Sequence, residues 1–156
     1  NEPCHQILYF YNYLKQPWKC QEKVRYIMDT FYGNKPDALS GNDDCGQMSA
    51  WYIFNTMGFY PTAPSSNVYN LGSPVLAAVD MMMSHGKHLR MTTGNWSARN
   101  VFVKEVYLNG KQYDKSYITY NDIKDGADLH FVMSSRPNYK RGVAERAVPP
   151  SVSEKR

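Results

Sequence analysis

The sequence predicts a mixed α and β chain in which helices come first and antiparallel strands follow. The hydrophobic period changes along the chain: up to about residue 60 apolar residues recur at helical spacing, and from residue 68 onwards they form short runs typical of strands. The segment 59–67, FYPTAPSSN, separates the two patterns. The 156 residues are 42% apolar and 14% aromatic, which is enough to build a core.

Three helices are expected in the first part. Pro3 suits the first turn of a helix, and the run 7–14 is apolar on nearly every side, which is typical of a buried helix. After the break at 15–17, an amphipathic helix follows, with its apolar stripe at Val24, Ile27, Met28 and Phe31. A third helix, apolar on most sides, is expected to begin near Asp44 and to end at Gly58.

Four short runs then predict strands: 68–81, 88–94, 100–123 and 128–135. Asn-Gly within 108–111 is a hairpin signal, and strands of this length indicate an antiparallel β-sandwich or part of one. We therefore divide the chain into a helical part (1–61), a sandwich segment (62–138) and a basic, flexible tail (139–156).

Composition excludes several classes of protein. The net charge is +4, but the 18 Lys and Arg residues are scattered, which argues against a nucleic-acid partner. No apolar run approaches the length of a membrane span. The three cysteines, Cys4, Cys20 and Cys45, follow neither a disulfide nor a zinc pattern. Because the chain lacks an initiator Met and enters a helix at once, we expect it to be part of a longer polypeptide.

Two adjacent acids, Asp43 and Asp44, stand where the third helix is expected to begin. Short connections make consecutive helices antiparallel, so the starts of the first and third helices should lie at the same end. Several other polar residues are expected at that rim: Asn1, Glu2, His5, Gln6, Asn42 and Gln47.

The start of a helix favours ionised carboxylates, because its N–H groups are unpaired and its dipole is positive there. Such a carboxylate suits a general base, a metal ligand or a simple N-cap. One cap needs only one carboxylate, whereas Asp43, Asp44 and Glu2 together concentrate negative charge that Ca²⁺ would relieve through its preference for oxygen ligands. The residues alone therefore indicate an acidic rim on a helical barrel and leave these roles open.

The segments 1–33 (NEPCHQILYFYNYLKQPWKCQEKVRYIMDTFYG) and 41–61 (GNDDCGQMSAWYIFNTMGFYP) closely resemble the end of the helical domain of glycoside hydrolase family 92. These enzymes are calcium-dependent exo-α-mannosidases. The strand region resembles the β segment that follows in the family, so the resemblance covers about residues 1–138. It implies the last helices of an (α/α)₆ barrel followed by antiparallel β-sandwich strands, within a larger multidomain enzyme.

The resemblance also implies a reaction, in which terminal α-linked mannose is hydrolysed with inversion. A general base activates water while a general acid, about 6.5–9.5 Å away, protonates the leaving oxygen. Asp44 takes the role of the base, and Asp43 is a possible second catalytic group. The family's general acid is a Glu that is expected before Asn1, so we expect the chain to be inactive by itself.

Further roles follow from the same resemblance. Substrate contacts are expected from Asn1, Glu2, His5, Gln6 and Asn42. Glu2, Asp43 and Asp44 are expected in the calcium shell, where the ion would bind vicinal hydroxyls of the sugar. For His5, a structural role is the alternative to a substrate contact. Trp18 and Trp51 are expected in the core. The implied partners are a mannose-containing glycan and the remainder of the polypeptide, in a secreted or periplasmic protein.

Two other functions are kept open. Other glycosidases use (α/α)₆ barrels, and a fold does not fix a reaction. A non-catalytic carbohydrate-binding module would bind sugar without metal and without Asp44, although aromatic platforms have no need of adjacent carboxylates. The preferred mannosidic linkage cannot be read from these residues.

Overall fold

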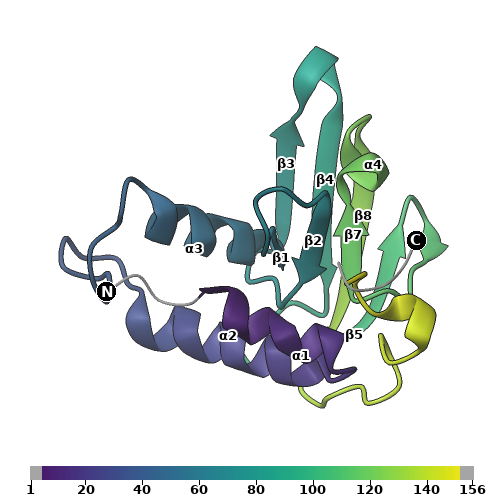
Figure 1. Cartoon of the computed structure of the whole chain (residues 1–156), viewed down its shortest axis with the longest axis horizontal. Coiled ribbons are helices and arrows are strands. Elements are labelled where there is room, and N and C mark those ends of the chain that lie inside the picture. The colour runs from purple at the N-terminus through teal and green to yellow at the C-terminus, as the bar shows by residue number, and fades with distance from the viewer. Residues whose placement is uncertain (1–4, 152–156) are drawn as a thin grey trace.

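The computed structural model describes residues 5–151 and places helices and strands in separate parts (Figure 1). The helical part consists of η1 (His5–Tyr9), α1 (Phe10–Tyr13), α2 (Pro17–Phe31) and α3 (Gln47–Met57). Successive segments run back and forth, so the end of α2 and the start of α3 lie on the same side as the start of η1 (Figure 1). The expected antiparallel arrangement is confirmed.

The helices enclose a small core. It consists of Tyr9, Cys20, Val24, Met28 and Trp51. The predicted apolar stripe of α2 is confirmed at Val24 and Met28, which are buried, whereas Ile27 is half-buried and Phe31 is 40% exposed. Trp51 is fully buried, as predicted, and Trp18 is half-buried against Tyr139.

The prediction that the first helix is buried on all sides is wrong for the described structure. It is a 3₁₀ turn followed by one α-helical turn, and it buries only His5, Tyr9 and Asn12. Ile7, Phe10 and Leu14 are 52%, 51% and 63% exposed. The reason is that only one face of this segment is covered by other described residues, so its other apolar side chains meet solvent.

Strands begin as soon as α3 ends at Gly58. One sheet has the order β1-β2-β7 and contains β1 (Phe59–Tyr60), β2 (Val68–Leu71) and β7 (Tyr117–Thr119). The other has the order β3-β4-β8-β5-β6. Its strands are β3 (Ala78–Met82), β4 (His88–Gly94), β8 (Ala127–Ser134), β5 (Phe102–Leu108) and β6 (Lys111–Gln112). Short helical turns complete the chain: η2 (Ser84–Gly86), α4 (Tyr120–Ile123) and η3 (Glu145–Ala147).

The two sheets share one core, in which Phe59, Leu71 and Ile118 of the first sheet join Met91, Val106, Phe131 and their neighbours of the second. Alternation along β8 buries every second side chain, as expected for a strand with one face in a core. The hairpin predicted at 108–111 is present, with positive φ at Asn109 and Gly110. One pair departs from the antiparallel prediction: β4 and β8 are parallel, because the chain crosses between them through β5, β6, β7 and α4.

The prediction of a flexible tail is wrong for residues 139–151. Arg141 and Ala147 are buried, and the Ala147 carbonyl accepts hydrogen bonds from the Ser116 amide and hydroxyl. Lys15 and Glu145 form an ion pair that links α1 to η3. The basic composition of this segment concealed the few apolar and hydrogen-bonding residues that hold it in place.

Candidate active site at the acidic loop

The acidic loop, residues 41–46, turns sharply before α3. Asp44, Cys45 and Gly46 have φ values of +51°, +59° and +92°, so α3 begins at Gln47 and not at Asp44 as predicted. Left-handed backbone at two successive residues other than glycine costs energy and is frequent at functional sites. This turn carries the Asp44 and Cys45 side chains away from the helix axis, and both residues are exposed.

Asp43 caps α3. One carboxylate oxygen, Oδ1, accepts hydrogen bonds from the Ser49 amide (2.8 Å) and the Ser49 hydroxyl (3.0 Å), and the Asp43 carbonyl accepts one from the Met48 amide. The amide of Ser49 is one of those that a helix leaves unpaired at its start. Asp43 therefore has the capping role that the sequence offered as one alternative, while its second oxygen makes no hydrogen bond within residues 5–151.

The carboxylate of Asp44 is different. It is exposed and makes neither a hydrogen bond nor an ion pair with any residue in the described range. The left-handed turn holds its backbone, since the Asp44 carbonyl accepts a hydrogen bond from the Gln47 amide (3.3 Å). A fixed backbone with an unengaged carboxylate is a suitable arrangement for a group that acts on water or a ligand.

Aromatic rings lie behind this loop. His5 stacks on Trp51 with ring centroids 4.8 Å apart, and Tyr32 stacks on Trp51 (5.4 Å) and on Tyr52 (5.1 Å). The Tyr32 hydroxyl lies 3.3 Å from His5 Nε2. Burial raises the pKa of Tyr32 to about 12, and the nearby Asp43 carboxylate acts in the same direction. The cluster joins the start of η1 and the end of α2 to residues 51 and 52 inside α3.

His5 is a buried neutral group in this cluster. Burial lowers the pKa of the imidazole below its usual value, and Nδ1 has no hydrogen-bond partner among the residues described. Its stacking on Trp51 favours a structural role for His5, which the sequence offered as the alternative to a substrate contact. Gln6 and Asn42 are exposed, Gln47 is half-buried, and Asn1 and Glu2 lie outside the described residues.

A hollow of about 450 Å³ opens beside Ser49, whose amide Asp43 caps. Its lining consists of Tyr32, Gly33, Asn34, Leu39, Ser49, Tyr52 and Ile53. Sequence reasoning missed Tyr32 and Ser49, because an aromatic residue at a helix end and a serine inside a helix have no distinctive spacing. Only the fold shows that they border the acidic loop.

The acidic loop offers the type of ligand that calcium prefers, but too few ligands to hold the ion. Carboxylate oxygens of Asp43 and Asp44 are hard ligands of the type Ca²⁺ prefers. However, within residues 5–151 no group of three or more His, Cys, Asp or Glu side chains is close enough to hold a metal ion. Since Ca²⁺ takes about 6–8 oxygen ligands, most of a calcium shell would have to come from elsewhere.

Comparison with known proteins places this geometry in context. The model of the glycosyl hydrolase family 92 catalytic domain matches residues 1–135. A family GH92 α-mannosidase from Bacteroides thetaiotaomicron, solved in complex with mannoimidazole, is 67% identical with a TM-score of 0.95. The match covers 98% of this chain and 20% of that chain.

Two further relatives are more distant. A family GH92 inverting mannosidase from Bacteroides thetaiotaomicron VPI-5482 is 35% identical with a TM-score of 0.92, over 99% of this chain and 21% of that one. A protein of Arthroderma benhamiae named as an uncharacterized secreted glycosidase is 26% identical over 97% of this chain and 20% of its own. The chain thus spans about a fifth of the length of these relatives.

Proposed function

Because the chain belongs to glycoside hydrolase family 92, we propose that it forms part of an exo-acting α-mannosidase that hydrolyses terminal α-linked mannose with inversion. The observation that carries the proposal is the exposed, unpaired carboxylate of Asp44 on a strained loop beside a capped helix. The names of the solved relatives, an α-mannosidase and an inverting mannosidase, support the reaction and its stereochemistry.

In this proposal Asp44 is the general base. Its carboxylate accepts a proton from the attacking water as the water oxygen bonds to the anomeric carbon. A base with no partner among residues 5–151 retains both oxygens for this purpose, whereas Asp43 has committed one oxygen to Ser49. A general acid from another part of the enzyme protonates the leaving oxygen, at the longer separation of carboxylates that inversion requires.

Asp43 serves mainly to position the base. Its hydrogen bonds to Ser49 fasten the acidic loop to the first turn of α3, and the loop in turn fixes the Asp44 backbone. The free oxygen of Asp43 remains available to a metal or to substrate. Gln6 and Asn42, together with Asn1 and Glu2, are proposed sugar contacts at the same rim, while the buried His5 takes the structural role that its stacking on Trp51 favours.

We propose calcium as the cofactor, held in part by Asp43 and Asp44, with Glu2 as a third candidate. When bound, the ion would supply a positive charge that orients sugar hydroxyls and assists distortion of the ring. The remaining ligands would come from outside residues 5–151, in keeping with the small number of carboxylates found together there.

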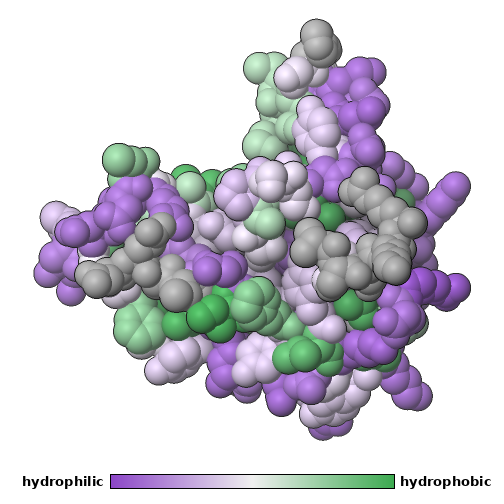
Figure 2. Space-filling view, viewed as in Figure 1, coloured by the Kyte–Doolittle hydropathy of each residue, from purple (hydrophilic) through white to green (hydrophobic). Residues whose placement is uncertain are grey.

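The further partners are the remainder of the polypeptide and the glycan. Exposed apolar side chains on the helices form a band in Figure 2 that other helices of a barrel would cover. None of the helices in residues 5–151 is long and apolar enough to cross a membrane. Secretion is proposed from the name of the fungal relative.

The test uses the intact enzyme that contains this chain and measures mannose release from an α-mannoside. We expect Asp44→Asn to lower kcat by about 10²–10⁴-fold with little change in Tm, the range for loss of a general base. Chelation of calcium should abolish turnover, and added calcium should restore it. Proton NMR of the first product should show β-mannose, as inversion requires.

A matched control is Asp125→Asn, which removes another exposed carboxylate without a partner within the described residues and should leave kcat unchanged. Asp43→Ala should lower Tm as well as kcat, because it removes a cap worth about 1 kcal/mol. Near-normal turnover in a folded Asp44→Asn enzyme would exclude Asp44 as the base. Activity that survives chelation would exclude the calcium role separately.

A further inference from the structure

A second hollow lies far from the acidic loop, beside β5 at the other end of the molecule's long axis (Figure 1). Its volume is about 280 Å³. It is bounded by β5, by the segment 112–114 that follows the β5–β6 hairpin, and by the turn 138–141. The lining residues that matter here are Lys104, Glu105, Asp114, Lys140 and Arg141.

Arg141 is a buried cation in this wall, and within residues 5–151 it has no carboxylate at ion-pair distance. The residue is only 6% exposed, and its Nη2 donates to the backbone carbonyls of Lys115 (2.7 Å) and Tyr113 (3.5 Å). Nε is buried without a partner, and no carboxylate forms an ion pair with the guanidinium within residues 5–151. Burial lowers the pKa of Arg141 to about 10, so it is still charged at neutral pH. A buried arginine is normally paired, because an uncompensated buried charge is destabilising.

The other charges of the pocket offset this charge only in part, since the Asp114 carboxylate acts on Arg141 without forming an ion pair with it in the described structure. Glu105 accepts a hydrogen bond from the Tyr107 hydroxyl (2.7 Å) and pairs with Lys104 (3.4 Å). Asp114 accepts a longer hydrogen bond from the Gly142 amide (3.4 Å). Lys140 is exposed and makes no side-chain ion pair in the described structure. Lys140 and Arg141 can therefore bind an anion, and so can Lys104, whose ammonium has donors left over from its exposed ion pair with Glu105.

The pocket is also rigidly built. The Asn138 side chain donates to the Lys104 carbonyl (2.8 Å), and its Oδ1 accepts from the amides of Lys140 (3.0 Å) and Arg141 (3.3 Å). On the β5 side, the register shifts between Val103 and Glu105, which marks a β-bulge at Lys104. The bulge and the Asn138 turn fix the backbone that carries the cationic side chains before any ligand arrives, which lowers the entropic cost of binding.

We propose that this pocket binds an oxyanion, namely a phosphate, sulfate or carboxylate group carried by a small ligand. An oxyanion would add to the partial counter-charge that Asp114 gives Arg141 and would accept hydrogen bonds from Lys140 and Lys104. The volume lies just below the usual range of ligand pockets, about 300–1,000 Å³, so the guest is one charged group with little attached to it.

The same chemistry is available within the chain, because Glu154 is an acid just beyond the described residues. The experiment must therefore separate a free oxyanion from this carboxylate. Inorganic sulfate is the probe, titrated into the intact enzyme at constant ionic strength and followed by calorimetry. Wild type is compared with a Lys104→Gln, Lys140→Gln double variant, with Glu154→Gln and with the control Lys124→Gln, an exposed lysine outside the pocket.

We expect saturable sulfate binding in wild type and in Lys124→Gln, weakened about tenfold or more in the double variant. Arg141 itself is left intact, because its removal would release the 113–115 segment and confuse folding with binding. An equal affinity in the double variant, or no saturable binding in any variant, would overturn the proposal. Binding that emerges only in Glu154→Gln would also overturn it, since the pocket would then be filled by the chain's own carboxylate.

Discussion

The helical and strand parts of this chain bury their apolar side chains to different extents. The core around the two sheets has thirteen buried residues, twelve from the strand part and Met57 from α3, whereas the core of the helical part has five. On the helices, many large apolar side chains stay at least a third exposed: Ile7, Phe10, Leu14, Tyr26, Phe31, Tyr52 and Ile53. An exposed apolar surface of this kind marks a face that another part of a protein covers.

The difference has a consequence for the candidate site. The acidic loop and its capping interaction belong to the helical part, whose core is the smaller of the two. The two sheets bury their apolar side chains against each other. The helices leave many of theirs exposed, as expected for part of a larger helical domain. The catalytic geometry proposed for Asp44 therefore depends on packing that residues 5–151 supply only in part.

The largest expected effect comes from the closed core. Phe131 of β8 is fully buried between the sheets, and Phe131→Ala should destabilise the 156-residue chain by about 3–5 kcal/mol, the range for large-to-small changes in a core. Phe10 is half-exposed, and Phe10→Ala should cost less than about 1 kcal/mol. Urea unfolding followed by circular dichroism measures both variants.

Equal losses in these two variants would contradict the comparison, because they would mean that the helices contribute as much to stability as the sheets. A larger loss of unfolding free energy in Phe10→Ala than in Phe131→Ala would contradict the comparison as well. A small loss at Phe131 would show that the sheets can repack around the cavity.

A smaller effect is expected at the uncovered helical face. Ile53→Lys places a charge where the side chain is 58% exposed, so the isolated chain should keep its Tm within about 2 °C and bind less of a hydrophobic dye. In the intact enzyme the same change should lower Tm or activity, because the face is proposed to be covered there. The matched control is Met82→Lys on β3, where the residue is 75% exposed. Equal effects of the two changes in the intact enzyme would argue that neither position is covered.

Much of this fold could be predicted from the sequence. The spacing of apolar residues predicted the helices and strands. Asn109 and Gly110 predicted the hairpin, and Gly58 predicted the end of α3. The parallel pairing of β4 with β8 could not be predicted, because strand order depends on long-range packing that local patterns do not encode. The packing of segment 139–151 was missed for a different reason: the local composition is basic, which predicts a solvated tail, although Arg141 and Ala147 are buried.

The candidate site was predicted in part. Adjacent acids before a helix drew attention to Asp43 and Asp44, and antiparallel helices brought His5 to the same end. The start of α3 was misplaced by three residues, because Asp44 and Cys45 adopt a left-handed backbone that is uncommon outside glycine. Sequence could not show which acid makes the cap, and the structure assigns that cap to Asp43.

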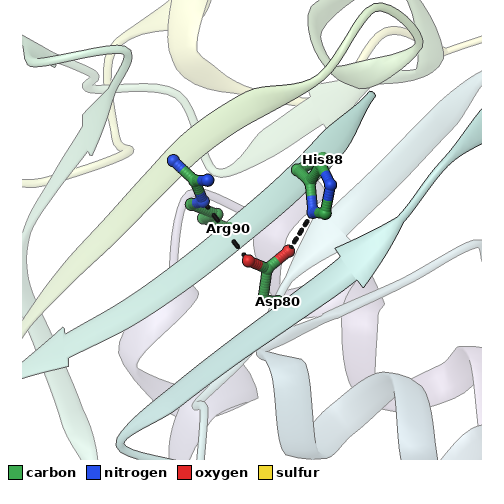
Figure 3. Close-up of polar contacts among 3 residues, drawn as sticks. All are labelled: Asp80, His88 and Arg90. Atoms are coloured by element: carbon green, nitrogen blue, oxygen red, sulfur yellow. Dashed lines mark hydrogen bonds and ion pairs between the residues drawn. The ribbon is translucent and has the colours of Figure 1, made fainter. Parts of the chain in front are cut away.

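The smallest effect is expected on the outer face of the strand part, where polar pairs contribute far less than the core beneath them. Asp80 of β3 lies between His88 and Arg90 of β4, 2.5 Å from His88 Nδ1 and 3.3 Å from Arg90 Nε (Figure 3). The hydrogen bond with His88, followed by that with Arg90, lowers the pKa of the Asp80 carboxyl below its ordinary value. All three side chains are exposed, so solvent and salt screen the cluster.

We expect His88→Gln to raise the pKa of Asp80 back toward its ordinary value, and Arg90→Gln to do so to a smaller extent, as followed by NMR of the carboxyl carbon. The sign of the linkage follows from the lowered pKa in the folded state. The cluster's contribution to stability is present above the ordinary carboxyl range and is lost as the pH falls through the lowered pKa of Asp80. Because the contribution is screened, neither change should alter Tm measurably at pH 7. A large fall in Tm at pH 7 would show that the outer face helps to hold the sheets together, and would remove the contrast between a closed core and a weakly coupled surface.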